Sequence, residues 1–291
     1  MSSLPPPPVP HPALAPAPGE PPSARDVPPW RAWTAPAALA SGLALGLFST
    51  IVVEVIAAAA GSSLSHPTAV VSILADVVFD LGFVVAALYF TSRQGRAHPA
   101  DFGYRRVRLR VAVPAFLVAS VSYYVLTAIY GSLLGLHAEK LPSELSTGNA
   151  TTAVAAVAAF VCVIAPIAEE FFFRGFFFGA LRGWRIVLGG QDIGTWVAAL
   201  ITGILFGAVH LGSAPAPDLV PLGFLGFVLC LLRWRTGSLY PCMALHSFNN
   251  SVALGVELHW SAVGTLGLMF GSWLVIAAVT GPLGARSPSI V

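Results

Sequence analysis

Long apolar stretches, each close to the length of a membrane span, recur along most of the chain after residue 34. A helix crosses a bilayer core of about 30 Å with about 20 apolar residues. The apolar positions here are continuous and do not alternate as they would in a membrane strand. The pattern therefore predicts an all-α, polytopic transmembrane helical bundle with about eight spans. We place them at residues 35–60, 67–91, 111–136, 151–181, 195–211, 219–232, 238–257 and 262–283.

The composition supports a membrane protein. The 291 residues are 56% hydrophobic and 10% charged, with a mean hydropathy of +0.79. These values lie outside the range of soluble globular proteins. The net charge of +2 is too small to indicate a nucleic-acid partner. Cys162, Cys230 and Cys242 all lie in apolar stretches and are odd in number, which predicts packing residues and not a disulfide framework.

The first 33 residues differ from the rest of the chain. Residues 1–30 hold twelve of the 24 prolines, and such a segment cannot build a packed core. We expect a disordered, extended tail over residues 1–33. A docking arm for a proline-recognising partner is the alternative.

The positive charges predict the orientation of the bundle. With eight spans, thirteen of the fifteen Lys and Arg residues fall on one side, and only Lys140 and Arg174 do not. Because such residues gather on the cytoplasmic side, we expect a multi-pass protein of the cell inner (plasma) membrane with both termini in the cytoplasm. The thirteen are Arg25, Arg31, Arg93, Arg96, Arg105, Arg106, Arg108, Arg110, Arg182, Arg185, Arg233, Arg235 and Arg286.

Three charged residues interrupt the apolar stretch Thr151–Leu181: Glu169, Glu170 and Arg174. An ionised side chain at a helix centre costs roughly 2.5–3.5 kcal/mol, so such residues are functional candidates. Glu170 and Arg174 are four positions apart on one helix face, with the acid on the N-terminal side as pairing prefers. We therefore expect Arg174 to neutralise Glu170 and Glu169 to remain free for chemistry. A charge pair that only fixes helix packing would leave Glu169 unexplained.

Two further spans carry polar side chains. His210 is predicted near the end of the fifth span, where a lone histidine is more often a packing group than a catalyst. In the seventh span, His246 and Asn250 share a helix face, whereas Asn249 is turned about 100° away. With a rise of 1.5 Å per residue, Glu169, His246 and His210 lie about 18, 12 and 22 Å deep. These depths are compatible with one shared cavity.

A second group of acids lies in the first two spans. Asp76 and Asp80 are four positions apart, and Glu54 lies in the preceding span. Paired membrane acids relay protons or bind cations, or they are protonated packing groups. We place all three outside the main site.

The segments EEFFFRG, FGAVH and HSFNN, in that order, resemble the CPBP family of intramembrane proteases (the Rce1/Abi group). That family includes the CAAX prenyl endopeptidases and bacteriocin-processing or self-immunity proteins. The resemblance covers roughly residues 150–256. Its patterns are E-E-x-x-x-R, F-x-x-x-H and H-x-x-x-N or D, and the matching positions are Glu169, Glu170, Arg174, Phe206, His210, His246 and Asn250.

The resemblance implies a role for each group. Glu169 and His210 would hold and deprotonate a water molecule, and His246 and Asn250 would donate hydrogen bonds to the developing oxyanion. Glu170 and Arg174 would orient the helix that carries them. We expect no cofactor. The alternative is a zinc ion held by Glu169, His210 and His246, since members have also been described as metalloproteases.

The resemblance also divides the chain. We expect N-terminal transmembrane helices over residues 34–148, the protease core over 149–258, and a C-terminal transmembrane helix with a tail over 259–291. The expected partners are the lipid bilayer and a membrane-embedded or membrane-anchored peptide or protein substrate. Two other functions fit the same residues: a non-catalytic immunity, regulatory or sorting-associated membrane protein, and a proton-coupled transporter.

Overall fold

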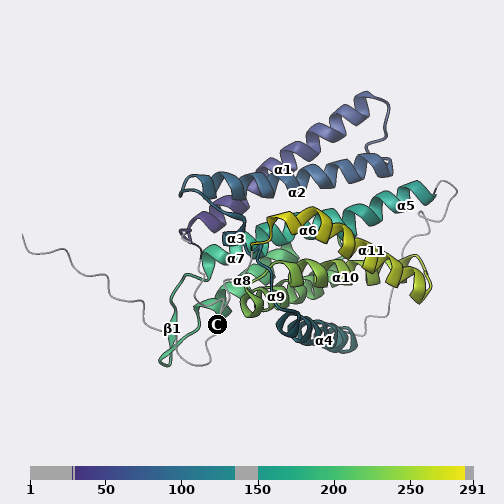
Figure 1. Cartoon of the computed structure of the whole chain (residues 1–291). Helices are drawn as coiled ribbons and strands as arrows, with labels where there is room; N and C mark the ends of the chain where they lie inside the picture. The colour runs from purple at the N-terminus through teal and green to yellow at the C-terminus, as the bar shows by residue number, and fades with distance from the viewer. Residues whose placement is uncertain (1–27, 29, 135–149, 286–291) are drawn as a thin grey trace, which may run out of the picture.

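The computed structural model describes residues 28, 30–134 and 150–285, and over these residues the chain is almost entirely helical (Figure 1). The predicted tail of residues 1–33 falls mostly outside the described residues. The helices are α1 (Thr34–Ala59), α2 (Ala69–Ser92), α3 (Pro99–Phe102), α4 (Leu109–Leu134), α5 (Ala150–Ala159), α6 (Ala165–Glu169), α7 (Phe178–Leu181), α8 (Gly194–Ala208), α9 (Leu219–Thr236), α10 (Tyr240–Glu257) and α11 (Ala262–Thr280). Two π-helical segments, Phe160–Ile164 and Glu170–Phe177, join α5, α6 and α7 into one rod, and short 3₁₀ turns lie at Ala216–Asp218 and Gly281–Leu283.

Every predicted span coincides with a helix, so the all-α transmembrane bundle is confirmed. Within the described ranges, six helices are long and apolar enough to cross a membrane. Two predicted spans, α8 and α10, are not among these six helices. Helix α8 has 15 residues, about 22 Å at 1.5 Å per residue, and α10 is made less apolar by the polar residues of its motif. The count of eight spans is therefore approximate.

The sequence predicted no strands, but the structure contains one small hairpin. Strands β1 (Val187–Leu188) and β2 (Gln191–Asp192) pair antiparallel between α7 and α8. Gly189 and Gly190 join them with φ values of 58° and 82°. Two successive positive φ values are the requirement of a tight two-residue hairpin turn, which explains the glycine pair.

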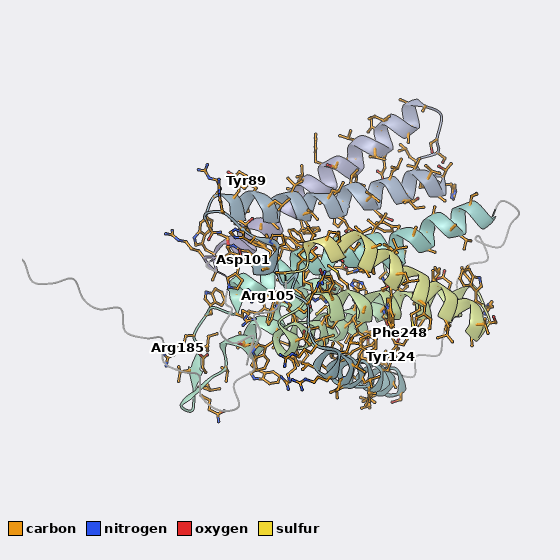
Figure 2. All side chains as sticks on the ribbon, in the orientation of Figure 1. Tyr89, Asp101, Arg105, Tyr124, Arg185 and Phe248 are labelled. Carbon is orange, nitrogen blue, oxygen red and sulfur yellow. The ribbon has the colours of Figure 1, made fainter. Side chains whose placement is uncertain are left out.

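One end of the bundle gathers the arginines. Three loops interlock there: Leu239 N–H donates to Gly103 O at 2.8 Å, the Ser238 hydroxyl donates to Arg105 O at 2.7 Å, and Arg106 N–H donates to Ala285 O at 3.1 Å. Figure 2 shows Arg105 and Arg185 at this end. We call it the arginine end. The name covers the arginines before α1, between α2 and the first turn of α4, between α7 and α8, and in the last turn of α9: Arg31, Arg93, Arg96, Arg105, Arg106, Arg108, Arg110, Arg182, Arg185, Arg233 and Arg235.

Glycines bring neighbouring helices into backbone contact. Helices α1 and α2 lie together along one edge of the bundle (Figure 1), and a Cβ on Gly82 would lie 2.7 Å from the backbone nitrogen of Gly46. On the other side, a Cβ on Gly226 of α9 would lie 2.9 Å from Gly203 Cα of α8. Small residues allow such close packing in membranes, where association depends on van der Waals contact.

The contact between α1 and α2 leads to a stability prediction. Replacing Gly82 with leucine forces the two backbones apart, and overpacking of this kind costs about 1–3 kcal/mol. The matched control is Gly131→Leu in α4, because a Cβ on Gly131 meets nothing within 4 Å. Thermal unfolding of the purified protein in detergent should show a lower midpoint for G82L alone. Equal midpoints for the two variants would contradict the packing described here.

Candidate active site

The helical rod that carries Glu169 and Glu170 departs from α-helical geometry on both sides of α6. The segments Phe160–Ile164 and Glu170–Phe177 are π-helical, a wider winding found mostly as short insertions at functional sites. All eight residues of the second segment are buried, and they include five phenylalanines and one arginine. The sequence pattern gave no sign of this winding.

Pro166 explains a contact between this rod and α10. In the first π-helical segment Ala165 N–H donates to Phe160 O, five residues back. In the same register residue 166 would donate to Val161 O, but proline has no N–H. The Asn250 side chain supplies the missing donor, with Nδ2 at 2.8 Å from Val161 O. This side-chain hydrogen bond, made where the backbone bond is missing, therefore fixes α10 to the rod.

A buried charge cluster forms a second link between the same elements. Arg174 Nη1 lies 3.1 Å from Glu170 Oε1, and both side chains are completely buried. The predicted pairing is present. The cluster also includes His246, whose Nδ1 lies 2.9 Å from the same Glu170 oxygen. The Arg174 guanidinium carbon lies 4.2 Å from the ring centre of Phe206, an arrangement that stabilises a buried cation.

Glu169 faces both imidazoles. Its Oε2 lies 3.9 Å from Nε2 of His210 and 3.9 Å from Nε2 of His246. Within the described part of the chain this oxygen is buried and has no hydrogen-bond partner. The side chains of Glu169 and His210 are 15% and 21% exposed, whereas that of Glu170 is fully buried. The structure thus brings together an uncommitted carboxylate and two imidazole nitrogens from three separate elements.

His210 was predicted inside the span 195–211, but α8 ends at Ala208 and His210 lies in the turn two residues later. Its Nδ1 is 2.7 Å from Phe206 O. Because a carbonyl oxygen only accepts hydrogen bonds, Nδ1 carries the proton, and Nε2 of the neutral ring is an acceptor directed at Glu169. The Phe206 ring lies 5.0 Å from the His210 ring and 5.7 Å from the His246 ring. Phe206 therefore positions both imidazoles.

Asn250 and Asn249 occupy the next turn of α10. Asn250 uses one Nδ2 hydrogen for Val161 O, and its Oδ1 is 3.4 Å from Asn249 Nδ2. The Tyr124 hydroxyl of α4 reaches Asn249 Oδ1 at 3.5 Å, and Tyr124 also packs on Phe248, as Figure 2 shows. Both asparagines link helices, and one Nδ2 hydrogen of Asn250 is not used by the contact with Val161.

Asp80, which we placed outside the main site, is buried on α2, the helix whose Phe83 packs against the rod. The side chain is 8% exposed, and its Oδ2 has no hydrogen-bond partner among the described residues. Phe83, one turn further along α2, packs on the Phe172 ring at 4.8 Å and so holds this face of α2 against the rod. Asp76 and Glu54 are exposed.

The donor atoms do not form a metal site as they stand. The described residues contain no group of three or more His, Cys, Asp and Glu side chains that could hold a metal ion. A tetrahedral zinc ion with bonds of about 2.0–2.1 Å would place its ligand atoms about 3.4 Å apart, closer than the 3.9 Å found here. The contact of His246 Nδ1 with Glu170 does not count against zinc, because a zinc-binding histidine commonly donates its other ring N–H to a carboxylate. The three cysteines are buried and free, which confirms them as packing residues.

The segment that carries this site is similar to a known protein family. Residues 151–252 match the family described as type II CAAX prenyl endopeptidase Rce1-like. The expected resemblance is thereby confirmed over the segment that carries all the site motifs. An Escherichia coli protein described as an uncharacterized 24.3 kDa protein is 30% identical over 164 residues, which are 55% of this chain and 65% of that protein. This chain thus covers slightly less than two thirds of that relative. No solved structure matches.

The two adjacent glutamates should respond differently to the same substitution. Glu170→Gln removes the counter-charge of the fully buried Arg174, and an unpaired buried charge costs about 3 kcal/mol or more. Glu169→Gln removes a charge that has no partner within hydrogen-bond distance, so stability should change by less than about 1 kcal/mol. Thermal and denaturant unfolding in detergent would measure both. Similar losses of stability in the two variants would show that Glu170 and Glu169 do not have the separate roles described here.

Proposed function

We propose that this chain is an intramembrane endopeptidase that hydrolyses a peptide bond of a membrane-embedded or membrane-anchored substrate. The family match supports a CAAX-type protease at the level of the family. The observation that carries the proposal is the position of Glu169 Oε2, 3.9 Å from two imidazole nitrogens and without a partner of its own. Substrate identity and mechanism in this chain are part of the proposal.

The 3.9 Å separations fit a water molecule. They exceed a direct hydrogen bond, but one water about 2.8 Å from each atom could bridge a pair of them. The two hydrogens of that water need two acceptors. An ionised Glu169 provides one. Nε2 of a neutral His210 ring, whose proton is on the Nδ1 that donates to Phe206 O, provides the other. Both acceptors polarise the water, and Glu169 takes its proton as the water oxygen attacks the peptide carbonyl carbon.

His246 has a different role in this mechanism. Its Nδ1 donates to Glu170, which also pairs with Arg174. In the proposed step the ring carries a proton on both nitrogens, and its Nε2–H donates to the carbonyl oxygen as negative charge develops there. The remaining Nδ2 hydrogen of Asn250 is the second donor. When the C–N bond breaks, the proton held by Glu169 passes to the leaving amine, so no outside acid is needed.

The first test compares cleavage in membranes that contain the wild-type protein, Glu169→Gln or His210→Ala. Removing the base should lower cleavage by about 10²–10⁴-fold, so peptide termini found with the wild type should disappear from the membrane proteome. Glu54→Gln, an acid of α1 that is exposed and lies outside the site, is the matched control and should cleave normally.

The outcomes separate the remaining functions. A cellular phenotype that survives both site variants would favour the non-catalytic immunity, regulatory or sorting-associated protein. Proton-coupled transport without any cleavage would favour the transporter. With purified protein and a substrate found in this way, activity that persists in a chelator supports the metal-free site. Activity lost to the chelator and restored by zinc would support the zinc alternative.

We also propose that the arginine end faces the cytoplasm, since lysine and arginine gather there in membrane proteins. The three native cysteines are buried, so an added cysteine can be labelled with little background. Ala97 lies in the exposed loop after α2 and Ser63 in the exposed loop between α1 and α2. In right-side-out vesicles a membrane-impermeant maleimide should label Ser63→Cys, and it should label Ala97→Cys only after permeabilisation. The reverse labelling would refute this orientation.

A further inference from the structure

A groove between α4 and α9, away from the catalytic residues, combines an apolar wall with two arginines. Its volume is about 420 Å³, within the range of about 300–1,000 Å³ typical of small-molecule sites. Ala119, Val228 and Leu232 are buried at its base, and Val118, which is 67% exposed, forms part of its rim. We call it the α4–α9 groove.

The two arginines lie at the same end of this groove. Arg110 is in the first turn of α4 and Arg235 in the last turn of α9, and both are exposed. No acidic side chain lines the groove, and the first turn of α4 contains none. Arg233, two residues before Arg235, differs: it is 4% exposed and lies directly against Gly103. The groove therefore presents two exposed positive charges beside the helix N-terminus of α4, which itself favours an anion.

The position of the groove in the membrane indicates the ligand. Arg110 and Arg235 mark the points where two apolar helices reach the arginine end, which is the level of the phosphate groups of a bilayer. From there the apolar lining continues along both helices towards the bilayer interior. A ligand that matches both parts has a phosphate at one end and a hydrocarbon chain at the other.

We propose that the α4–α9 groove binds one anionic phospholipid, with its phosphate between Arg110 and Arg235 and an acyl chain along the groove. A second hollow of about 540 Å³ at the same end contains another arginine pair, Arg31 and Arg93, beside Trp33 and Tyr89. Polar and aromatic groups line that hollow, and its lining residues include no aliphatic side chain to match an acyl chain. The α4–α9 groove is therefore the specific site, and its occupancy does not depend on whether the protein is a protease.

The test is a lipid titration of the purified full chain by native mass spectrometry. Phosphatidylglycerol and phosphatidylcholine with identical acyl chains serve as probes. A basic residue near a membrane surface contributes about 1 kcal/mol, or about five-fold in affinity. Arg110→Gln and Arg235→Gln should each weaken phosphatidylglycerol binding about five-fold, and the double variant about 25-fold. Arg185→Gln, an exposed arginine of the same end that does not line the groove, is the control and should bind normally.

A second variant tests the apolar part. Ala115→Leu fills the groove and leaves both arginines in place, so it should lower binding of phosphatidylglycerol, whereas the binding of free phosphate would not change. Size-exclusion chromatography checks that each variant is folded. Equal affinity for the two lipids, or full phosphatidylglycerol binding by the double variant or by A115L, would overturn the proposal.

Discussion

The buried ion pair of Glu170 and Arg174 is the interaction on which the site depends. Arg174 is completely buried, and a guanidinium in such surroundings requires a fixed counter-charge. Glu170 provides it and in the same position accepts from His246. The consequence is geometric: with Nδ1 held by Glu170, the opposite nitrogen of the His246 ring is directed at Glu169. A costly charge pair thereby fixes the orientation of an imidazole that belongs to another helix.

Helix α10 is fixed to the rod at two points one turn apart. His246 contacts Glu170, and Asn250 replaces the hydrogen bond that Pro166 cannot make to Val161. Two contacts on one face prevent α10 from rotating about its axis, which a single contact would allow. The π-helical winding contributes because it shifts the hydrogen-bond register by one residue and leaves that carbonyl free. Asn250, four residues after His246, therefore has a structural function whether or not it touches a substrate.

The sequence predicted what depends on local spacing and missed what depends on contacts between helices. The pairing of Glu170 with Arg174 followed from a separation of four residues. The contact of Glu170 with His246 did not, because 76 positions separate the two residues. The burial of Asp80 was not predictable for a related reason. It depends on how Gly82 and Phe83 pack α2 against α1 and the rod, which the sequence pattern does not show. The winding around Pro166 was also not predictable, since a single proline inside an apolar run is equally compatible with a simple kink.

An uncompensated charge distinguishes a group that can act on a ligand from one that maintains the fold. Glu169 and Glu170 are neighbours of identical chemistry, yet the charge of Glu170 is shared by two partners and that of Glu169 by none within hydrogen-bond distance. The arginine end repeats the contrast: Arg233 is buried against the loop at Gly103, and Arg235 is exposed above the α4–α9 groove. In a low-dielectric interior or at a membrane surface, such groups interact most strongly with a ligand of opposite charge or with a proton. Burial and partners, more than residue type, therefore indicate where this chain binds its ligands.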